Sequence, residues 1–212
     1  MLATGVLREE HRVIEVVLNC LECLADQAER GNAFDRESAA DALEFFRTFA
    51  DRCHHHKEEA HLFPMMEAKG FSATHGPTSV MRAEHETGRE LLHAMEEAIR
   101  GRQMGMAGGT NAFARFSRAY GTLLREHIRK EEECLFAMAD ASFSEEDQRT
   151  LLSSFQHVES YDLHAGTHAE YLSRARGLAE RLGVLWPAIE ATGPRCGCDC
   201  HAHTDRQLSG NS

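Results

Sequence analysis

The sequence predicts an all-α protein, specifically an up-down four-helix bundle with an additional C-terminal helix or helix pair. Apolar residues recur at helical spacing along almost the whole chain, strand-like alternation is absent, and only four prolines interrupt the pattern. An internal repeat is the third observation. The sequence Arg-Glu-Glu-His at 8–11 returns as Arg-Ala-Glu-His at 82–85, and the motif His-x-x-Lys-Glu-Glu-x-x-Leu-Phe-x-Met at 54–65 returns at 127–138. Two near-copies of one helix pair with short connections would close into a bundle with approximate two-fold symmetry.

Start and stop signals delimit the four helices of the expected bundle. Gly31 ends the first, Asp35 serves as N-cap of the second, and Gly70 follows its end, with Pro64 kinking its last turns. Pro77 suits the first turn of the third helix. A Gly/Met-rich loop separates the third helix from the fourth. The helices are expected at about 4–30, 35–69, 77–101 and 111–140, with the loop at 101–110.

The C-terminal part adds one interrupted helix and a tail. Ser144-Glu145-Glu146-Asp147 resembles a capping box, and the helix that it opens should break near Tyr161 and resume to about Leu185. We therefore expect a helical domain at 1–185 and a flexible Cys/His-containing tail at 186–212. The run Cys-Gly-Cys-Asp-Cys-His-Ala-His at 196–203 is dense enough in soft ligands to bind zinc or copper, although its spacing matches no zinc finger.

Composition excludes several classes of partner. The 23 Lys and Arg residues against 34 Asp and Glu give a net charge of −11, which repels nucleic-acid backbones and anionic membranes. The sequence contains no stretch of eighteen apolar residues, and its first ten residues lack the features of a signal peptide. We expect a cytoplasmic protein without a disulfide framework, because seven cysteines is an odd number and four of them fall within helical patterns.

Six ionisable residues lie on the otherwise apolar faces of the four helices. Two pairs, each a histidine followed four residues later by a glutamate, occupy matching depths in the second and fourth helices, and one histidine joins from each of the other two helices. These candidate ligands are His11, His54, Glu58, His85, His127 and Glu131. Fourteen histidines in the chain also favour metal ligation or proton chemistry.

A buried glutamate needs a positive partner, and no Lys or Arg lies on these faces. Two carboxylates shared among four or five imidazoles suit two cations bridged by both carboxylates. Mixed nitrogen and oxygen ligands without a thiolate fit iron or manganese and are compatible with zinc. The pattern therefore predicts a two-metal centre inside the bundle.

These motifs resemble the hemerythrin-like, or HHE cation-binding, domain family over roughly residues 5–140. The resemblance lies in His11, Glu84-His85, and the two runs His-His-His-Lys-Glu-Glu-x-x-Leu-Phe-Pro at 54–64 and His-Ile-Arg-Lys-Glu at 127–131. It implies an oxo- or hydroxo-bridged pair of iron ions, with an open position for dioxygen, peroxide or nitric oxide. Iron is favoured over other metals mainly by this resemblance.

One ligand of the family's oxygen carrier is missing, because Met81 stands four residues before His85. We expect His168, on the C-terminal helix, to replace it, with His157 and His164 as competitors. Tyr120, two turns before His127, could instead hydrogen-bond or ligate there. Glu59 and Glu132 are expected to be solvated. His55, His56 and His61 are expected to point outward or to hydrogen-bond behind the ligands.

The expected function is that of a cytoplasmic non-haem di-iron protein that binds or reacts with dioxygen, peroxide or nitric oxide. Whether it is an enzyme stays open: turnover would resemble that of a catalase or peroxidase. Two other classes are a non-catalytic iron- or oxygen-sensing or metal-handling module and a protein with a structural zinc or manganese site. Ligand identity alone does not distinguish these classes, and the sequence leaves the oligomeric state open.

Overall fold

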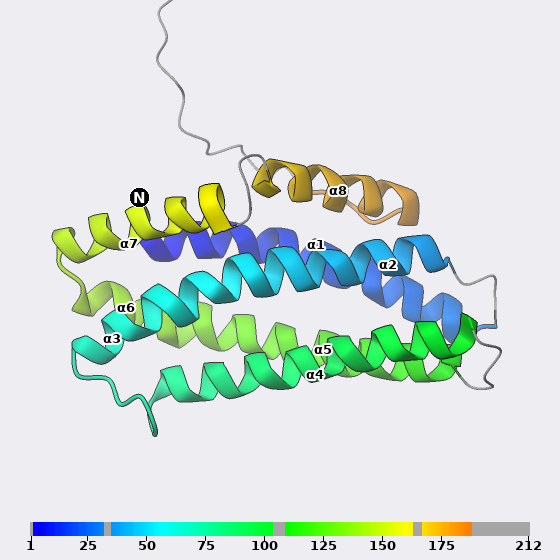
Figure 1. Cartoon of the computed structure of the whole chain (residues 1–212), viewed down its shortest axis with the longest axis horizontal. Helices are drawn as coiled ribbons and strands as arrows, with labels where there is room; N and C mark the ends of the chain where they lie inside the picture. Colours follow the sequence, from blue (N-terminus) through cyan, green and yellow to red (C-terminus); the bar gives the residue numbers. More distant parts are fainter. Residues whose placement is uncertain (1, 32–34, 104–108, 163–166, 188–212) are drawn as a thin grey trace, which may run out of the picture.

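A computed structural model describes residues 2–31, 35–103, 109–162 and 167–187, and within these ranges the chain is helical without strands. Four long helical segments lie side by side, and successive segments run in opposite directions (Figure 1). The first is α1 (Ala3–Glu29) and the third is α4 (Pro77–Gln103). The second consists of α2 (Arg36–Phe45), η1 (Phe46–His55), η2 (Glu58–Leu62) and α3 (Phe63–Ala68), and the fourth of α5 (Gly109–Lys130), η3 (Glu131–Leu135) and α6 (Phe136–Ser142). The predicted helical bundle is confirmed.

The predicted helix signals have the expected geometry. The Asp35 side chain accepts a hydrogen bond from the Ser38 backbone N–H at 3.1 Å, and Gly31 has a φ of 67° after α1. Ser144 and Asp147 form a reciprocal capping box at the start of α7 (Glu145–His157). The chain continues through η4 (Val158–Asp162) to α8 (Thr167–Leu182). Residues 163–166, which include His164, and residues 188–212 with their Cys/His cluster lie outside the described residues.

The segments η1, η2, η3 and η4 are π-helical, with backbone hydrogen bonds from residue i to i+5. Two of them obey the internal repeat, because η2 and η3 begin at Glu58 and Glu131. Pro64 lies in the first turn of α3, directly after η2. The second and fourth segments thus change their winding where the candidate ligands lie.

The hydrophobic core consists of two clusters separated by a polar layer. One cluster includes Ile14, Ala50, Leu92 and Leu124. The other includes Leu7 and lies toward the opposite end of the bundle. Along each of the four segments, a histidine of the candidate site falls between residues of the two clusters. The bundle therefore places its ionisable residues together at one level of the core.

The C-terminal helices pack on one side of the bundle. Both α7 and α8 contact α1, and α8 also contacts α2 (Figure 1). Leu151 and Phe155 of α7 and Tyr171 and Ala175 of α8 are buried in this packing. Among the described helices, none combines the length and apolar character that crossing a membrane would require.

Candidate metal centre

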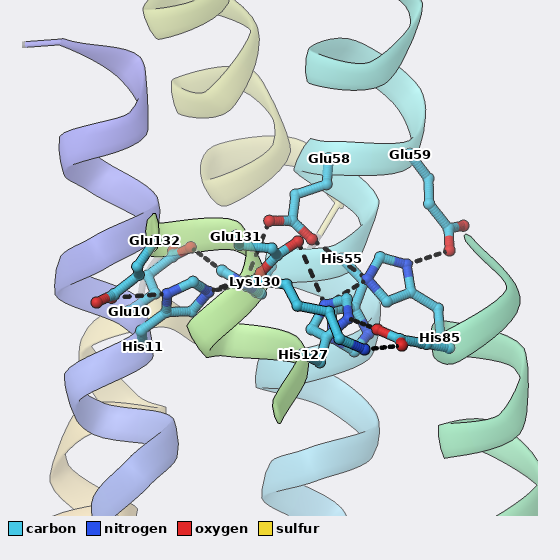
Figure 2. Close-up of polar contacts among 12 residues, drawn as sticks. Glu10, His11, His55, Glu58, Glu59, His85, His127, Lys130, Glu131 and Glu132 are labelled. Carbon is cyan, nitrogen blue, oxygen red and sulfur yellow. Dashed lines mark hydrogen bonds and ion pairs between the residues drawn. The ribbon is translucent and has the colours of Figure 1, made fainter. Parts of the chain in front are cut away.

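The six ligands predicted from the repeat converge in the polar layer, and all six are buried (Figure 2). They form two groups that could each hold a metal ion, with the ligand atoms of a group within 4.8 Å of one another. We call these groups position A and position B. Position A comprises His11, His54, Glu58 and Glu131, and position B comprises His85, His127, Glu58 and Glu131.

Glu58 and Glu131 belong to both positions, because each carboxylate directs one oxygen toward each histidine pair. Glu58 lies 3.5 Å from Nε2 of His54 through Oε1 and 3.4 Å from Nε2 of His85 through Oε2. Glu131 lies 3.2 Å from Nε2 of His11 through Oε2 and 3.3 Å from Nε2 of His127 through Oε1. This arrangement follows from the repeat, which places the two carboxylates face to face.

The polar atoms of the centre are not satisfied by one another. None of the four carboxylate oxygens of Glu58 and Glu131 has a hydrogen-bond partner of good geometry. The Nε2 atoms of His11 and His54 are 2.9 Å apart, and those of His85 and His127 are 3.0 Å apart. Buried groups of this kind are costly unless a cation or proton lies among them. The donor set therefore fits metal cations.

A supporting carboxylate stands behind each of the four histidines. Nδ1 of each imidazole lies within 3.0 Å of a carboxylate oxygen: the pairs are His11 with Glu132, His54 with Glu10, His85 with Glu59, and His127 with Glu84. A carboxylate that accepts the Nδ1 proton leaves Nε2 free to bind a metal, and such partners orient metal-binding histidines. The expectation that Glu59 and Glu132 are simply solvated was wrong, because both lie within this hydrogen-bonding arrangement.

The electrostatics of the centre show that protons and cations would compete for the same atoms. Burial and the facing carboxylate of Glu131 raise the pKa of Glu58 well above its usual value. Burial opposes ionisation of Glu131 as well, but His127 and His11 outweigh it and hold the Glu131 pKa well below its usual value. Burial would lower the pKa of His127, yet Glu131 and Glu84 raise it to about 9. A metal ion at position B must therefore displace a proton from His127.

His55, not His168, is the additional histidine at position B. It forms a third group with His85 and His127, and its ring stacks on that of His85 with centroids 3.9 Å apart. Both of its ring nitrogens are buried, and Nδ1 lies 3.5 Å from Oδ1 of Asp51. Burial lowers the pKa of His55 to about 3, so the imidazole is neutral, as a ligand must be. If this segment were α-helical throughout, as the sequence predicts, His55 would point away from the helix face that carries His54.

The structure does not bring His168 to either position. Its Nε2 lies 3.7 Å from Oε1 of Glu10, and its ring stacks on Phe49 with centroids 5.3 Å apart. It therefore stands behind the supporting carboxylate of His54, and with Glu10 and Glu159 it forms a separate acidic group. The expectation failed because the helical row of α8 shows which residues face the bundle, but not how far they reach into it.

Tyr120 is buried next to position B, as the spacing from His127 predicts. Its ring packs edge-on against Phe46, with centroids 5.0 Å apart, and burial raises the pKa of its hydroxyl. Together with Gly88 and the imidazoles of position B, it lines a cavity of about 10 Å³, which is close to the size needed for one water molecule. No hydrogen bond from Tyr120 to a candidate ligand is present among the described contacts. Tyr120 therefore forms part of the cavity wall.

Comparison with known proteins agrees with this geometry. A model of the Hemerythrin HHE cation binding domain matches residues 2–139, which is more than half of the chain and includes all six ligands predicted from the repeat. No significant match was found among curated proteins or solved structures. The matched region ends before α7, so α7, η4 and α8 lie outside it.

Proposed function

The chain belongs to the hemerythrin HHE cation-binding family, and from this premise we propose that it is a di-iron protein in which Glu58 and Glu131 would be shared as ligands by two iron ions. The observation that carries the proposal is the pairing of each carboxylate with both histidine pairs, at 3.2–3.5 Å from oxygen to nitrogen. A single ion at one position would leave the other histidine pair, and the carboxylate oxygens that face it, without a cation. Two ions would engage both histidine pairs.

The ligand set favours iron over softer metals. Both positions offer imidazole nitrogen and carboxylate oxygen, and neither group includes a cysteine. Such donors suit Fe and Mn and are compatible with Zn, whereas thiolates would favour Zn or Cu(I). We therefore propose iron as the resident metal, with manganese and zinc as the outcomes that the experiment below must exclude.

The number of protein ligands differs between the two positions. Position A has four, and position B has five if His55 binds there together with its neighbours. Iron with a coordination position not filled by protein can bind dioxygen, peroxide or nitric oxide. The residues around it exclude bulk water, hold Nδ1 of the four imidazoles against carboxylates so that Nε2 faces the site, and limit any incoming molecule to a small one. We propose that the protein binds or reacts with such small oxidants.

Purified protein prepared without chelators tests the proposal through its metal content and its optical spectrum. We expect two iron ions per chain and a spectrum that changes when the anaerobic protein is exposed to air. A peroxide decay assay then separates turnover from reversible binding or sensing, because only an enzyme consumes peroxide catalytically. A metal content of one transition-metal ion per chain or less would refute the di-metal proposal, and two zinc or two manganese ions would refute its iron part.

A further inference from the structure

The internal repeat predicts equal support for His54 of position A and His127 of position B. Nδ1 of His54 lies 3.0 Å from Oε2 of Glu10, and Nδ1 of His127 lies 3.0 Å from Oε2 of Glu84. The other oxygen of each carboxylate pairs with a lysine, Lys57 or Lys130. The same chain of contacts, from lysine through glutamate to histidine, therefore stands behind each position.

The two chains of contacts differ in their environment. Lys57 and Glu10 are 0% and 2% exposed, whereas Lys130 and Glu84 are 39% and 17% exposed. The C-terminal helices cause this difference, because they cover only the Lys57 side of the bundle. Nζ of Lys57 lies 2.5 Å from Oε1 of Glu159 in η4 and 5.8 Å from the centroid of the Phe155 ring in α7.

Burial changes what each lysine contributes. Water can replace the ammonium of Lys130 when that side chain is removed, because Glu84 is partly solvated. Water has no such access to Glu10, and the other basic group near its Oε1, Nε2 of His168, is 3.7 Å away, so the carboxylate depends mainly on Lys57 to stay in place. If Glu10 shifts, the Nδ1–H of His54 loses the acceptor that orients the ring toward position A. Lys57 is thus joined to the metal centre through two contacts of defined geometry.

We propose that Lys57 is a positioning residue for His54, held in place by Glu159, and that the C-terminal helices thereby make position A different from position B. This inference rests on the proposed metal centre. It assigns a role in metal binding to α7 and η4, which lie beyond the region shared with the family. The ammonium of Lys57 faces both Glu10 and Glu159, so a single positive charge lies between two carboxylates.

The test compares Lys57→Met with its repeat-related counterpart Lys130→Met in the full chain. Each variant is loaded anaerobically with Co²⁺, and the affinity of each of the two ions is measured by chelator competition and visible absorption. We expect Lys57→Met to weaken one ion by about 10–100-fold, as loss of a partner behind a metal ligand typically does, and to change its absorption. Lys130→Met should weaken binding by less than tenfold, and Arg149→Met, on the exposed face of α7, should leave both affinities unchanged.

Two further variants separate positioning from a general loss of structure. Lys57→Arg keeps the positive charge and should restore most of the affinity. Glu159→Gln removes the charge that holds Lys57 while keeping the shape of the side chain, and it should weaken the same ion as Lys57→Met. If Lys57→Met does not fold, Glu159→Gln decides the question alone.

The outcomes distinguish this inference from the proposed function. Equal losses in Lys57→Met and Lys130→Met, or unchanged affinities in Glu159→Gln, would overturn the positioning role while leaving the two-metal centre intact. Failure of the unmodified protein to bind two Co²⁺ ions would instead overturn the proposed centre itself. A selective loss at one ion, rescued by Lys57→Arg, supports the inference.

Discussion

At the scale of single residues, Glu58 combines full burial with a pKa well above its usual value. A raised carboxyl pKa means that the ionised form destabilises the protein above the ordinary pKa, so Glu58→Gln should stabilise the metal-free protein at pH 8 by about 1–3 kcal/mol. The same variant should also bind metal more weakly, and the loss should exceed the 10–100-fold that is typical when a residue supporting a metal ligand is removed. Urea unfolding in chelator and metal analysis measure the two effects. Glu133→Gln, on the exposed surface, is the control, and a Glu58 variant that retains both ions contradicts the bridging role.

Protonation of the ligands predicts the pH dependence of metal binding. The pKa values of Glu58 and His127 are raised, the latter to about 9, so both carry protons below these values and must release them to bind an ion. Burial lowers the pKa values of His54 and His85 to about 3, so these imidazoles are already neutral. Affinity for Co²⁺ should therefore rise from pH 6 to pH 8, by about tenfold per pH unit for each proton released. Chelator competition across this range checks the sign, and a constant affinity would contradict it.

Gly88 controls the size of the cavity beside position B. A Cβ added there would meet the Tyr120 ring at 3.6 Å and Leu123 at 3.9 Å, so alanine fits but a larger side chain fills the cavity. We expect Gly88→Val to slow the optical response to dioxygen or nitric oxide at least several-fold while both metal ions stay bound. Stopped-flow absorption measures the rate, with Gly177→Ala in α8 as a control, because Gly177 is outside the cavity lining and a Cβ added there would meet nothing within 4 Å. Unchanged kinetics would show that small molecules reach the centre by another route.

At the scale of elements, the helix signals and the repeat allowed the four long segments and the convergence of the six candidate ligands to be predicted. The winding within a helix could not be predicted in this way. His55 follows His54 directly, and in an α-helix the two would face different sides; the π-helical segment η1 holds more residues per turn, and both imidazoles reach the centre. The supporting carboxylates were missed for a similar reason, because Glu59 and Glu132 lie one residue beyond a ligand and reach around the helix to a neighbouring segment.

The C-terminal helices depend on the capping box at Ser144. Its side chain accepts from the Asp147 N–H at 3.2 Å, and the Asp147 carboxylate accepts from the Ser144 N–H at 2.8 Å. Ser144→Ala should therefore lower the free energy of unfolding by about 1 kcal/mol, measured by urea denaturation. Ser153→Ala, in the exposed middle of α7, should change it by less than about 0.5 kcal/mol. Equal effects of the two substitutions would show that the cap does not stabilise α7 measurably.

At the scale of the whole molecule, the polar layer divides the hydrophobic core into two clusters of unequal size. Hydrophobic periodicity predicts the buried faces, but it contains no information on what holds two apolar clusters together across charged residues. Cations at positions A and B would do so, because each position joins side chains of three segments and the two positions together join all four. A ligand that binds only the folded state adds about 2.7 kcal/mol to the free energy of unfolding at a hundredfold excess over its Kd. Chelation should therefore lower the melting temperature.

The unequal clusters also predict where the metal-free protein opens first. The smaller cluster lies among the beginning of α1, the end of α3 and α6, and it packs against α7 through Leu151 and Phe155. Without a cation, this end is attached to the larger cluster only across the polar layer, so local opening there requires less free energy than global unfolding. Hydrogen exchange after chelation should increase most at 3–8, 62–68 and 135–142 and least at 13–28, and restoring the metal should reverse the change. A uniform increase along the chain would mean that the two clusters unfold together as one cooperative unit, in spite of the polar layer between them.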